Sequence, residues 1–340
     1  GDILKAIREA MEGKHFQEFK DIDYLPEKLG KRVLTTGGHF GYLKIAEGCD
    51  KHCTYCIIPK LRGKFRSVPM ERLVTQAKEM AEEGVKELIL VAQETTVYGT
   101  DIYGKKSLHI LLKELCKIKG IRWIRVLYCY PEEIYDELIQ TMKEEKKICH
   151  YLDLPIQHAS DRILKRMGRR TTQAELVEIV NKLRREIPDI VLRTTLISGF
   201  PGETQEDHEE LMSFVDEMEF DRLGVFTYSP EEDTPAATMP DQVAEEVKEA
   251  RRDEIMELQQ EISYDKGTDR IGQELLVMIE GKVADESAYI GRTYGDAPKV
   301  DGYIFVQTGE LLMTGDFAKV RVTGALEYDL IGELADEYTE

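Results

Sequence analysis

Residues 48–56 of this 340-residue chain read Gly48-Cys49-Asp50-Lys51-His52-Cys53-Thr54-Tyr55-Cys56. The three cysteines are spaced C-x3-C-x2-C, and no fourth cysteine follows at close range. Three thiolates on one loop can hold three irons of a 4Fe-4S cube and leave the fourth iron open to a small molecule. We therefore interpret Cys49, Cys53 and Cys56 as the ligands of such a cluster.

Two other uses of these cysteines stay open. A zinc site needs four ligands in a tetrahedron, and the nearby candidate, His52, stands directly beside Cys53, which makes joint ligation awkward. Inert structural thiols are the second alternative, although three of them would not need to share one polar loop. The other cysteines, Cys116, Cys129 and Cys149, lie in or beside predicted core elements, and we interpret them as small buried hydrophobic side chains.

Composition and charge narrow the class of protein. Hydrophobic residues make up 42% and charged residues 33% of the chain, which is enough apolar material for more than one small domain. No apolar run approaches membrane-spanning length, and no secretory leader is recognisable. Because six cysteines without a secretory context indicate a reducing compartment, we expect a cytoplasmic protein with no membrane partner.

Compact apolar runs alternate with helical stretches along most of the chain. Six β-α units in series favour an α/β fold with a parallel sheet, which the right-handed crossover rule curls into a partial (β/α)6, TIM-like barrel. A doubly wound sheet is the competing interpretation, although no G-x-G-x-x-G motif follows any of the strands. The expected strands are 41–46, 86–92, 122–128, 151–155, 190–197 and 222–228, and the expected helices are 70–83, 107–118, 131–145, 172–186, 204–219 and 240–264.

The pattern changes after a long acidic helix that ends near Gly267. Residues 268–334 alternate apolar and polar positions and carry many glycines, which predicts about five strands in a small antiparallel, OB-like β-barrel. At the other end, the chain opens with a helix-like segment and then loses periodicity. We expect four parts: a leader over 1–38, the partial barrel over 39–266, the small β-barrel over 267–335 and a tail over 336–340.

Several motifs together carry a resemblance to a known family. The cysteine loop, with Tyr55 before the last cysteine, resembles the cluster loop of radical S-adenosylmethionine (SAM) enzymes. The longer run 48–67, GCDKHCTYCIIPKLRGKFRS, is similar to the signature of the methylthiotransferases within that superfamily. The runs 154–158 (LPIQH) and 199–203 (GFPGE) match the same family, as does a partial barrel followed by a small β-barrel, which there is the TRAM module. The match covers essentially the whole chain.

This resemblance implies a SAM site at the carboxyl ends of the barrel strands, where such barrels collect their chemistry. The open iron would take the amino acid end of SAM, with further contacts to its methionine part from Gln93 or Glu94. The adenine is expected near Ile197, Ser198 and Gly199, because a glycine lets backbone approach a ring without a Cβ in the way. An ordinary strand-to-helix turn is the alternative for this glycine.

Further candidates come from neighbouring strand ends. Arg193 lies, by alternation, on the strand face that carries the adenine contacts, so it could bind the SAM carboxylate, while an ion pair with Asp153 is the alternative. Gln157 closes the fourth strand and is counted among the SAM contacts, and Tyr55 is expected to pack against SAM or the cluster. The catalytic residues stay unknown: His158 could move a proton, but a packed structural histidine fits equally well.

A basic run follows the cysteines in an otherwise acidic chain. Such runs are usually solvated surface. Beside the expected mouth of the barrel, this one could also attract SAM or an anionic substrate side chain. The run consists of Lys60, Arg62, Lys64 and Arg66.

The charge of the small β-barrel bears on the substrate class. Residues 268–334 carry six Lys and Arg against twelve Asp and Glu. Because nucleic-acid affinity depends largely on neutralising phosphates, this acidic module favours a basic protein partner, and ribosomal proteins are mostly basic. The resemblance then implies addition of a methylthio group to the β-carbon of an aspartate in the twelfth small-subunit ribosomal protein. A methylthiotransferase acting on an adenosine of transfer RNA (MiaB type) is the alternative, and an iron–sulfur electron carrier or sensor is a more distant one.

The resemblance also implies a reaction with two clusters. An unknown reductant protein supplies one electron that cleaves SAM to methionine and a 5′-deoxyadenosyl radical, which removes a hydrogen atom from the substrate. Full-length methylthiotransferases hold a second 4Fe-4S cluster on three cysteines of an N-terminal domain, and no cysteine precedes Cys49 here. We therefore expect that domain to be missing from this chain, the leader to be its connector, and sulfur insertion to be incomplete while SAM cleavage survives.

Overall fold

The computed structural model describes residues 2–19, 21–23, 34–284 and 286–335. Its largest sheet has six strands in the order β1-β4-β5-β6-β7-β8, and all neighbours are parallel. Because crossovers between parallel strands are right-handed, an order that never reverses puts the connecting helices on one face and curls the sheet. The strands are β1 (Phe40–Lys44), β4 (Glu87–Val91), β5 (Trp123–Val126), β6 (Ile148–Asp153), β7 (Val191–Ser198) and β8 (Arg222–Thr227).

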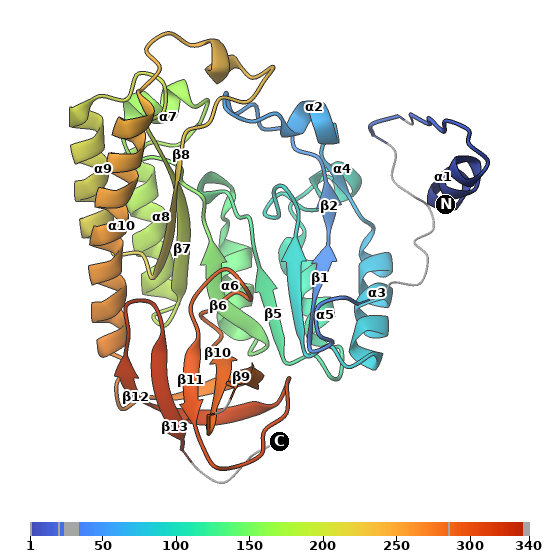
Figure 1. Ribbon diagram of the computed structural model, residues 1–340, viewed down its shortest axis with the longest axis vertical. Coiled ribbons are helices and arrows are strands. Elements are labelled where there is room, and N and C mark those ends of the chain that lie inside the picture. The colour runs from blue at the N-terminus through green and yellow to red at the C-terminus, as the bar shows by residue number, and fades with distance from the viewer. Residues whose placement is uncertain (1, 20, 24–33, 285, 336–340) are drawn as a thin grey trace.

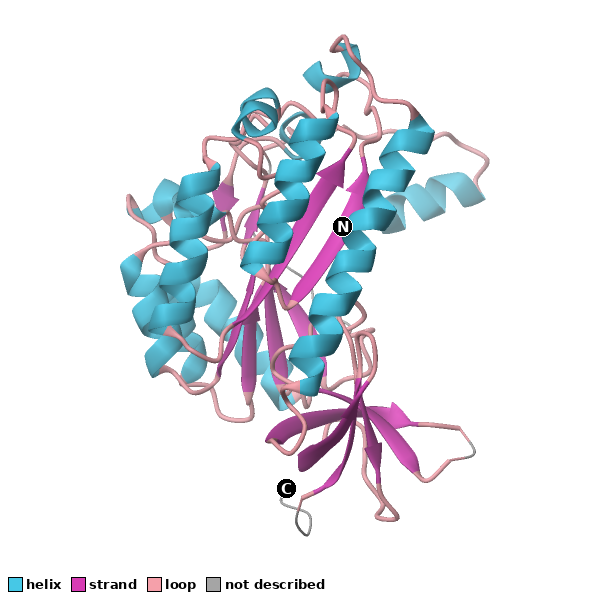
Figure 2. Cartoon of the chain, turned by 90° about the vertical axis from the view of Figure 1, so that its left-hand side faces the viewer, coloured by secondary structure: helices cyan, strands magenta, loops and turns pink. Residues whose placement is uncertain are grey.

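Helices cover the outer face of this sheet (Figure 1), and Figure 2 shows the strands inside a curved wall of helices. The partial (β/α)6 barrel expected from the sequence is therefore confirmed. The doubly wound alternative is wrong, because the strand order has no reversal point. The covering helices are α3 (Met70–Glu82), α5 (Leu108–Cys116), α6 (Asp136–Glu144), α8 (Gln173–Glu186), α9 (Gln205–Met218) and α10 (Glu245–Thr268).

The main core lies between the sheet and these helices. In α3, Leu73, Ala77 and Met80 are buried, and their spacing of four and three residues places them on one face of the helix. On the sheet side, Leu88 and Leu90 of β4 are buried in the same cluster. The apolar faces of the helices thus bury the outer face of the curled sheet.

Several short elements were not expected from the sequence, because a few residues are too few to show a periodic pattern. The helix expected over 131–145 also begins differently: Pro131–Glu133 forms a 3-10 turn (η1), Ile134 is extended, and α6 starts only at Asp136. The helix expected at the start of the chain is α1 (Asp2–Met11). The additional elements are β2 (Ala46–Glu47), α2 (Ile58–Arg62), β3 (Arg66–Ser67), α4 (Thr100–Tyr103), α7 (Asp161–Arg166) and η2 (Pro235–Thr238). Of the expected end segments, the tail over 336–340 and residues 24–33 of the leader lie outside the described residues.

A closed barrel of five strands follows α10, as expected for residues 268–334. Its strand order is β10-β11-β13-β12-β9, and one pair, β11 with β13, is parallel. The other four strand pairs are antiparallel, as expected. The parallel pair is the exception, because β12 pairs on the far side of β13 and so brings β13 back alongside β11. The strands are β9 (Glu274–Lys282), β10 (Ala288–Arg292), β11 (Ile304–Gln307), β12 (Phe317–Ala325) and β13 (Leu330–Leu334).

The C-terminal barrel packs against the amino-terminal ends of the sheet strands, below the sheet in Figure 1. Trp123, the first residue of β5, meets Phe317 edge-to-face with ring centroids 4.8 Å apart. Phe40, the first residue of β1, belongs to the same buried cluster as Met278 of β9. The small barrel thus covers the floor of the large one, and the rim formed by the carboxyl ends of the strands stays at the opposite end.

Candidate functional site

The cysteine loop lies at this rim, between β2 and α2. Cys49 and Cys53 are each 6% exposed, and Cys56 is half-buried. Gly48 starts the loop with φ +78°, and a Cβ there would collide with the carbonyl oxygens of residues 63 and 64. The backbone N–H of Gly48 donates to Oε1 of Gln93 at 2.8 Å, which ties the loop to the end of the neighbouring strand β4.

Two of the three sulfurs have a polar neighbour within hydrogen-bond distance. The backbone N–H of Lys51 donates to Cys49 Sγ at 3.4 Å. The Tyr130 hydroxyl lies 3.8 Å from Cys53 Sγ. Burial raises the pKa of the Cys49 thiol to about 11, so this thiol keeps its proton at neutral pH until a metal displaces it.

A cavity of about 640 Å³ opens beside these cysteines, within the size range of cofactor sites in proteins. Its wall includes Cys49, Cys56, Gln93, Tyr128 and Tyr130. Within the described part of the chain, no three His, Cys, Asp or Glu side chains converge on a single metal ion. A cube does not require such convergence, because each of its thiolates binds a different iron. Cys49 and Cys56 line this cavity, and Cys53 lies between them on the same loop, so the loop fits a 4Fe-4S cluster.

Glu94 places a buried carboxyl group next to the cysteine loop. The side chain is buried with 1% exposure, and it lines a smaller cavity of about 210 Å³ together with Cys49. Its Oε1 accepts the Thr96 N–H at 2.9 Å, whereas Oε2 has no partner among the residues that the structure describes. Burial raises the pKa of Glu94 to about 7. A buried carboxylate oxygen without a partner is costly, and a cationic ligand group such as the ammonium of SAM would satisfy it.

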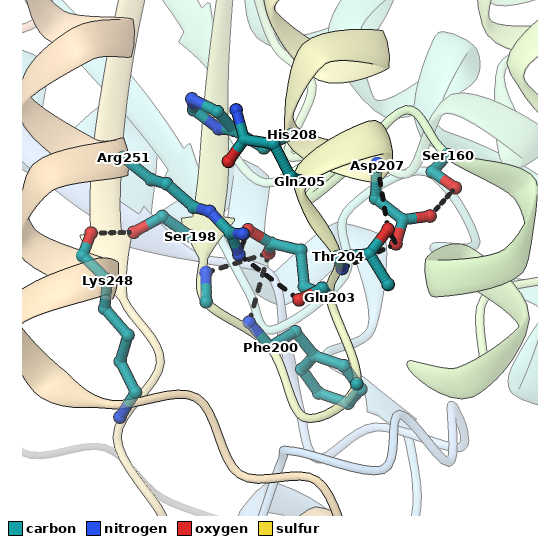
Figure 3. A network of polar contacts seen from close by, with 12 residues as sticks. Ser160, Ser198, Phe200, Glu203, Thr204, Gln205, Asp207, His208, Lys248 and Arg251 are labelled. Atoms are coloured by element: carbon teal, nitrogen blue, oxygen red, sulfur yellow. Dashed lines mark hydrogen bonds and ion pairs between the residues drawn. The ribbon is translucent and has the colours of Figure 1, made fainter.

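The glycine turn after β7 is held by a buried carboxylate (Figure 3). Glu203 Oε2 accepts the N–H groups of Gly199 at 2.8 Å and Phe200 at 3.1 Å, and Oε1 accepts a hydrogen bond of 2.9 Å from Arg251. Gly199 has φ +68°, and a Cβ there would collide with the side chain of Lys248. The turn therefore requires glycine. This is compatible with both interpretations of Gly199 from the sequence, close approach to adenine and an ordinary strand-to-helix turn.

The other predicted contacts of this region are placed as follows. The backbone N–H of Ile197 donates to the Gln157 carbonyl oxygen at 2.8 Å, so these two residues lie side by side. The Ser198 hydroxyl donates to the Lys248 carbonyl oxygen at 3.0 Å and serves the link to α10. Tyr55 meets Phe200 edge-to-face with centroids 6.4 Å apart. All of these residues follow or end strands at the rim.

Arg193 forms the ion pair with Asp153 that was the alternative to binding SAM. His158 is packed among protein groups, which was the alternative to moving a proton. Arg193 donates to Asp153 Oδ1 at 2.7 Å and lies 3.4 Å from Asp301 of the C-terminal barrel. These two carboxylates therefore offset its positive charge near the floor of the large barrel. His158 is fully buried. Its Nδ1 accepts the Ser160 N–H at 3.0 Å, and its Nε2 lies 3.5 Å from Glu203 Oε2. This packed position corresponds to a structural histidine.

The basic run beside the cysteine loop is engaged in ion pairs. Arg66 pairs with Asp23 at 2.9 Å, and Arg62 lies 3.9 Å from Glu47. Lys60 Nζ donates to the Asp233 carbonyl oxygen at 2.7 Å. Neighbours on this chain therefore already take up three of the four charges.

Tyr130 and Arg169 lie near Cys53. The sequence assigned neither of them a role in the site. Tyr130 follows β5 in the polar stretch at a strand end, which is a weak signal for a site residue. Arg169 stands in the loop after α7, and no local pattern marks it. The structure brings it over the Tyr130 ring, with the guanidinium carbon 4.4 Å from the ring centroid.

We expect Gly199→Ala to weaken SAM binding at least tenfold while the iron content of the chain stays unchanged. Positive φ costs an alanine roughly 1–2 kcal/mol, and the collision with Lys248 adds to that by shifting the turn. Equilibrium binding of SAM to the reconstituted protein measures the effect. Gly104→Ala is the matched control, because Gly104 has φ +70° but nothing within 4 Å of an added Cβ. Equal losses in both variants would contradict the role of the turn.

The start of α9 gives a prediction on acid stability. Burial alone would raise the pKa of Asp207, but hydrogen bonds from Arg162, Thr204 and Ser160 hold it at about 2. Figure 3 shows the contacts with Thr204 and Ser160. A carboxylate with a lowered pKa in the folded state stabilises the fold above its ordinary pKa and loses this effect as the pH falls toward 2. We expect Asp207→Asn to lower the free energy of unfolding at pH 7 by about 1–2 kcal/mol, with a difference that shrinks below pH 4.

Urea unfolding of both proteins between pH 7 and pH 3 tests this expectation. Glu175→Gln serves as the control, because Glu175 closes a capping box with Thr172 at the start of α8. Its carboxylate accepts both the N–H and the hydroxyl of Thr172 and, within the described part of the chain, no arginine. A smaller loss is expected there. A pH-independent effect of Asp207→Asn would overturn the electrostatic account.

Comparisons with known proteins agree with this architecture. The model of the radical SAM superfamily matches residues 43–215, and that of the TRAM domain matches residues 271–335. Among solved structures, coproporphyrinogen III oxidase (HemN) from Escherichia coli, described as a radical SAM enzyme, has a TM-score of 0.50 at 18% identity, over 83% of this chain and 66% of that chain. At this identity the likeness concerns the fold alone. No helix in the described residues has the length and apolar character to cross a membrane.

Curated relatives are much more similar in sequence. Ribosomal protein uS12 methylthiotransferase RimO of Lachnoclostridium phytofermentans is 64% identical over 330 residues, which cover 97% of this chain and 75% of the relative. The protein of the same name from Clostridioides difficile is 48% identical over 336 residues, which cover 99% of this chain and 76% of the relative.

Proposed function

Because this chain belongs to the RimO family of radical SAM methylthiotransferases, we propose that it acts in the methylthiolation of ribosomal protein uS12. The observation that carries the proposal is the set of three thiols at the rim of the barrel, beside a cavity of about 640 Å³. The preference for a ribosomal protein over transfer RNA, drawn from the sequence, agrees with the names of these relatives. The β-carbon of an aspartate is our proposed point of attack.

Cys49, Cys53 and Cys56 are the proposed ligands of a 4Fe-4S cluster. When bound, the cluster supplies one electron, delivered by a reductant protein, for the cleavage of SAM into methionine and a radical that takes hydrogen from the substrate. The chain's own residues position SAM and keep water away from it. The unpaired Oε2 of Glu94 is the proposed partner of the SAM ammonium, because it is a buried carboxylate oxygen beside the cysteine loop.

The remaining SAM contacts are proposed along the rim. The tie between Gln93 and Gly48 sets the cysteine loop against β4, and Tyr55 closes the wall against Phe200. Backbone at the end of β7 would receive the adenine. Arg193 is the weakest member of the set, because its guanidinium already pairs with two carboxylates. The proposed contacts are Tyr55, Gln93, Glu94, Gln157, Arg193, Ile197, Ser198 and Gly199.

The acidic C-terminal barrel is proposed to contact the basic substrate protein at a distance from its modified residue. This follows from its place, because the barrel covers the floor and the cysteine loop lies at the opposite rim (Figure 1). A ribosomal substrate also makes the cytoplasm the proposed location. The second cluster that methylthiolation requires is proposed to lie outside these 340 residues, since no cysteine precedes Cys49 in them.

Oxygen-free reconstitution tests the function. We expect about four irons per chain and, after addition of reductant and SAM, one 5′-deoxyadenosine for each SAM cleaved. A chain with its cluster intact that forms no 5′-deoxyadenosine would favour the electron carrier. Binding of the chain to uS12 but not to transfer RNA at moderate salt is expected. The reverse result would favour the transfer RNA type.

A further inference from the structure

Cys53 lies against an aromatic side chain that the proposed SAM site does not use. The sulfur is buried, and the Tyr130 hydroxyl lies 3.8 Å from it, within the range of a hydrogen bond to sulfur. Tyr130 stands between β5 and η1 and lines the cavity beside Cys49 and Cys56. Its hydroxyl therefore reaches the cluster loop from a different part of the barrel.

A buried arginine covers the ring of this tyrosine. The side chain of Arg169 is 1% exposed and lies 3.7 Å from Glu132, and one of its N–H groups donates to the Pro155 carbonyl oxygen at 3.0 Å. The guanidinium carbon is 4.4 Å from the centroid of the Tyr130 ring, a distance at which a cation is attracted to the ring face. Arg169 thereby fixes the ring that carries the hydroxyl.

Two nitrogens of Arg169, Nε and one terminal nitrogen, are buried and have no hydrogen-bond partner among the described residues. Leaving a buried charged group with unused donors is costly. Glu132 lies 3.7 Å from the remaining nitrogen of Arg169, so the two unused donors can bind a second negatively charged group. The cluster expected at Cys53 is such a group, because Arg169 covers the ring of Tyr130, whose hydroxyl lies 3.8 Å from Cys53 Sγ.

A second cation lies near the same ring. Lys51 Nζ is 5.1 Å from the ring centroid, and Lys51 pairs with Glu133 and lies 3.7 Å from Glu132. Because Glu133 pairs closely with Lys51, the donors left over at this place are the Tyr130 hydroxyl and the unused nitrogens of Arg169.

We propose that Tyr130 and Arg169 raise the reduction potential of the cluster by acting on Cys53, an inference that rests on the proposed cluster. Reduction adds negative charge to the cluster and its thiolates. A hydrogen bond to a thiolate sulfur and a nearby positive charge both stabilise the reduced form more than the oxidised form. Tyr130 and Arg169 are thus positioning and tuning residues, which set how readily the cluster takes up the electron that SAM cleavage consumes.

Spectroscopic redox titration of the reconstituted chain tests this proposal. In Tyr130→Phe the hydroxyl is lost and the ring stays, and in Arg169→Met the charge is lost from a side chain of similar length. We expect each variant to favour the oxidised cluster about three- to tenfold more than the parent chain, where tenfold corresponds to 59 mV for one electron. Arg169→Lys, which keeps the charge, should restore part of the shift.

Matched controls separate tuning from damage. Tyr135 also has a cation over its ring, Lys106 at 5.4 Å, but its hydroxyl serves His109. Arg184 also donates to a backbone carbonyl oxygen, that of Met218, at 2.6 Å. Tyr135→Phe and Arg184→Met should leave the potential unchanged.

The outcomes distinguish the inference from the proposed function. A parent chain that binds no iron refutes the proposed function. Loaded clusters with the parent potential in both Tyr130→Phe and Arg169→Met overturn the inference alone. If one variant fails to hold its cluster, the other decides, and a shift toward a more negative potential in it supports the inference.

Discussion

Replacing Cys49 by alanine is expected to abolish both cluster binding and SAM cleavage. Without Cys49, the cube keeps only two of its three protein ligands, and the neighbouring Glu94 does not replace a thiolate. Iron should fall from about four to less than one per chain, and formation of 5′-deoxyadenosine should fall at least 100-fold. Iron analysis, the absorbance of the reconstituted protein and chromatography of the nucleoside product measure these changes.

The cysteines outside the loop provide the controls for this prediction. Cys116 and Cys149 lie in or beside core elements and have no place at the rim. Cys116→Ala and Cys149→Ala should keep the iron content and the nucleoside product of the parent chain. A full cluster in Cys49→Ala, or a lost cluster in Cys116→Ala, would show that the ligand set is wrong.

Local signals in the sequence were sufficient for the order of the barrel and for part of its site. Parallel strands buried on both faces read as short apolar runs, so β4 and β5 could be located, and polar residues after them could be assigned to one rim. The cysteines and the glycine turn were found because motifs of a few adjacent residues encode them. Gly199 is an example, because its positive φ favours glycine, and a glycine is visible directly in the sequence.

Contacts between distant segments could not be predicted in this way. Arg169 is a single charged residue in a loop, and only the fold brings it to the Tyr130 ring. For Arg193, the sequence gave the strand face and, as the alternative, the partner Asp153, but not the second carboxylate, because Asp301 comes from the other barrel. The parallel pairing of β11 with β13 likewise depends on where β12 pairs, which the alternation of residues does not encode.

The junction of the two barrels contains a buried ion network that the sequence also concealed. Glu87, the first residue of β4, is fully buried. Its Oε1 accepts from Arg125 Nε at 2.8 Å, and its Oε2 accepts from Arg292 of the C-terminal barrel at 2.7 Å. Burial alone would raise the pKa of Glu87, but Arg292 and Arg125 hold it below its usual value. The carboxylate is therefore ionised and joins the two barrels.

Glu87→Gln is accordingly expected to lower the free energy of unfolding by about 3–5 kcal/mol, the usual result of removing one partner of a buried charge network. The change leaves Arg125 and Arg292, both fully buried, without their shared counter-ion. Because the pKa of Glu87 is lowered in the folded state, this stabilisation is present above the ordinary glutamate pKa and is lost as the pH falls below it. The gap between the two proteins should therefore narrow in acid.

Trp123 makes this expectation directly measurable, because it is the single tryptophan of the chain and packs on Phe317 across the junction. Urea unfolding followed by its fluorescence and by circular dichroism should coincide in the parent chain, whereas in Glu87→Gln the fluorescence should change at lower urea. Glu274→Gln is the control, because its pair with Arg321 at 2.8 Å is solvent-exposed and is worth at most about 1 kcal/mol. If both variants lost less than about 1 kcal/mol, the hydrophobic contacts of Trp123 and Phe317 would hold the barrels together without the ion network.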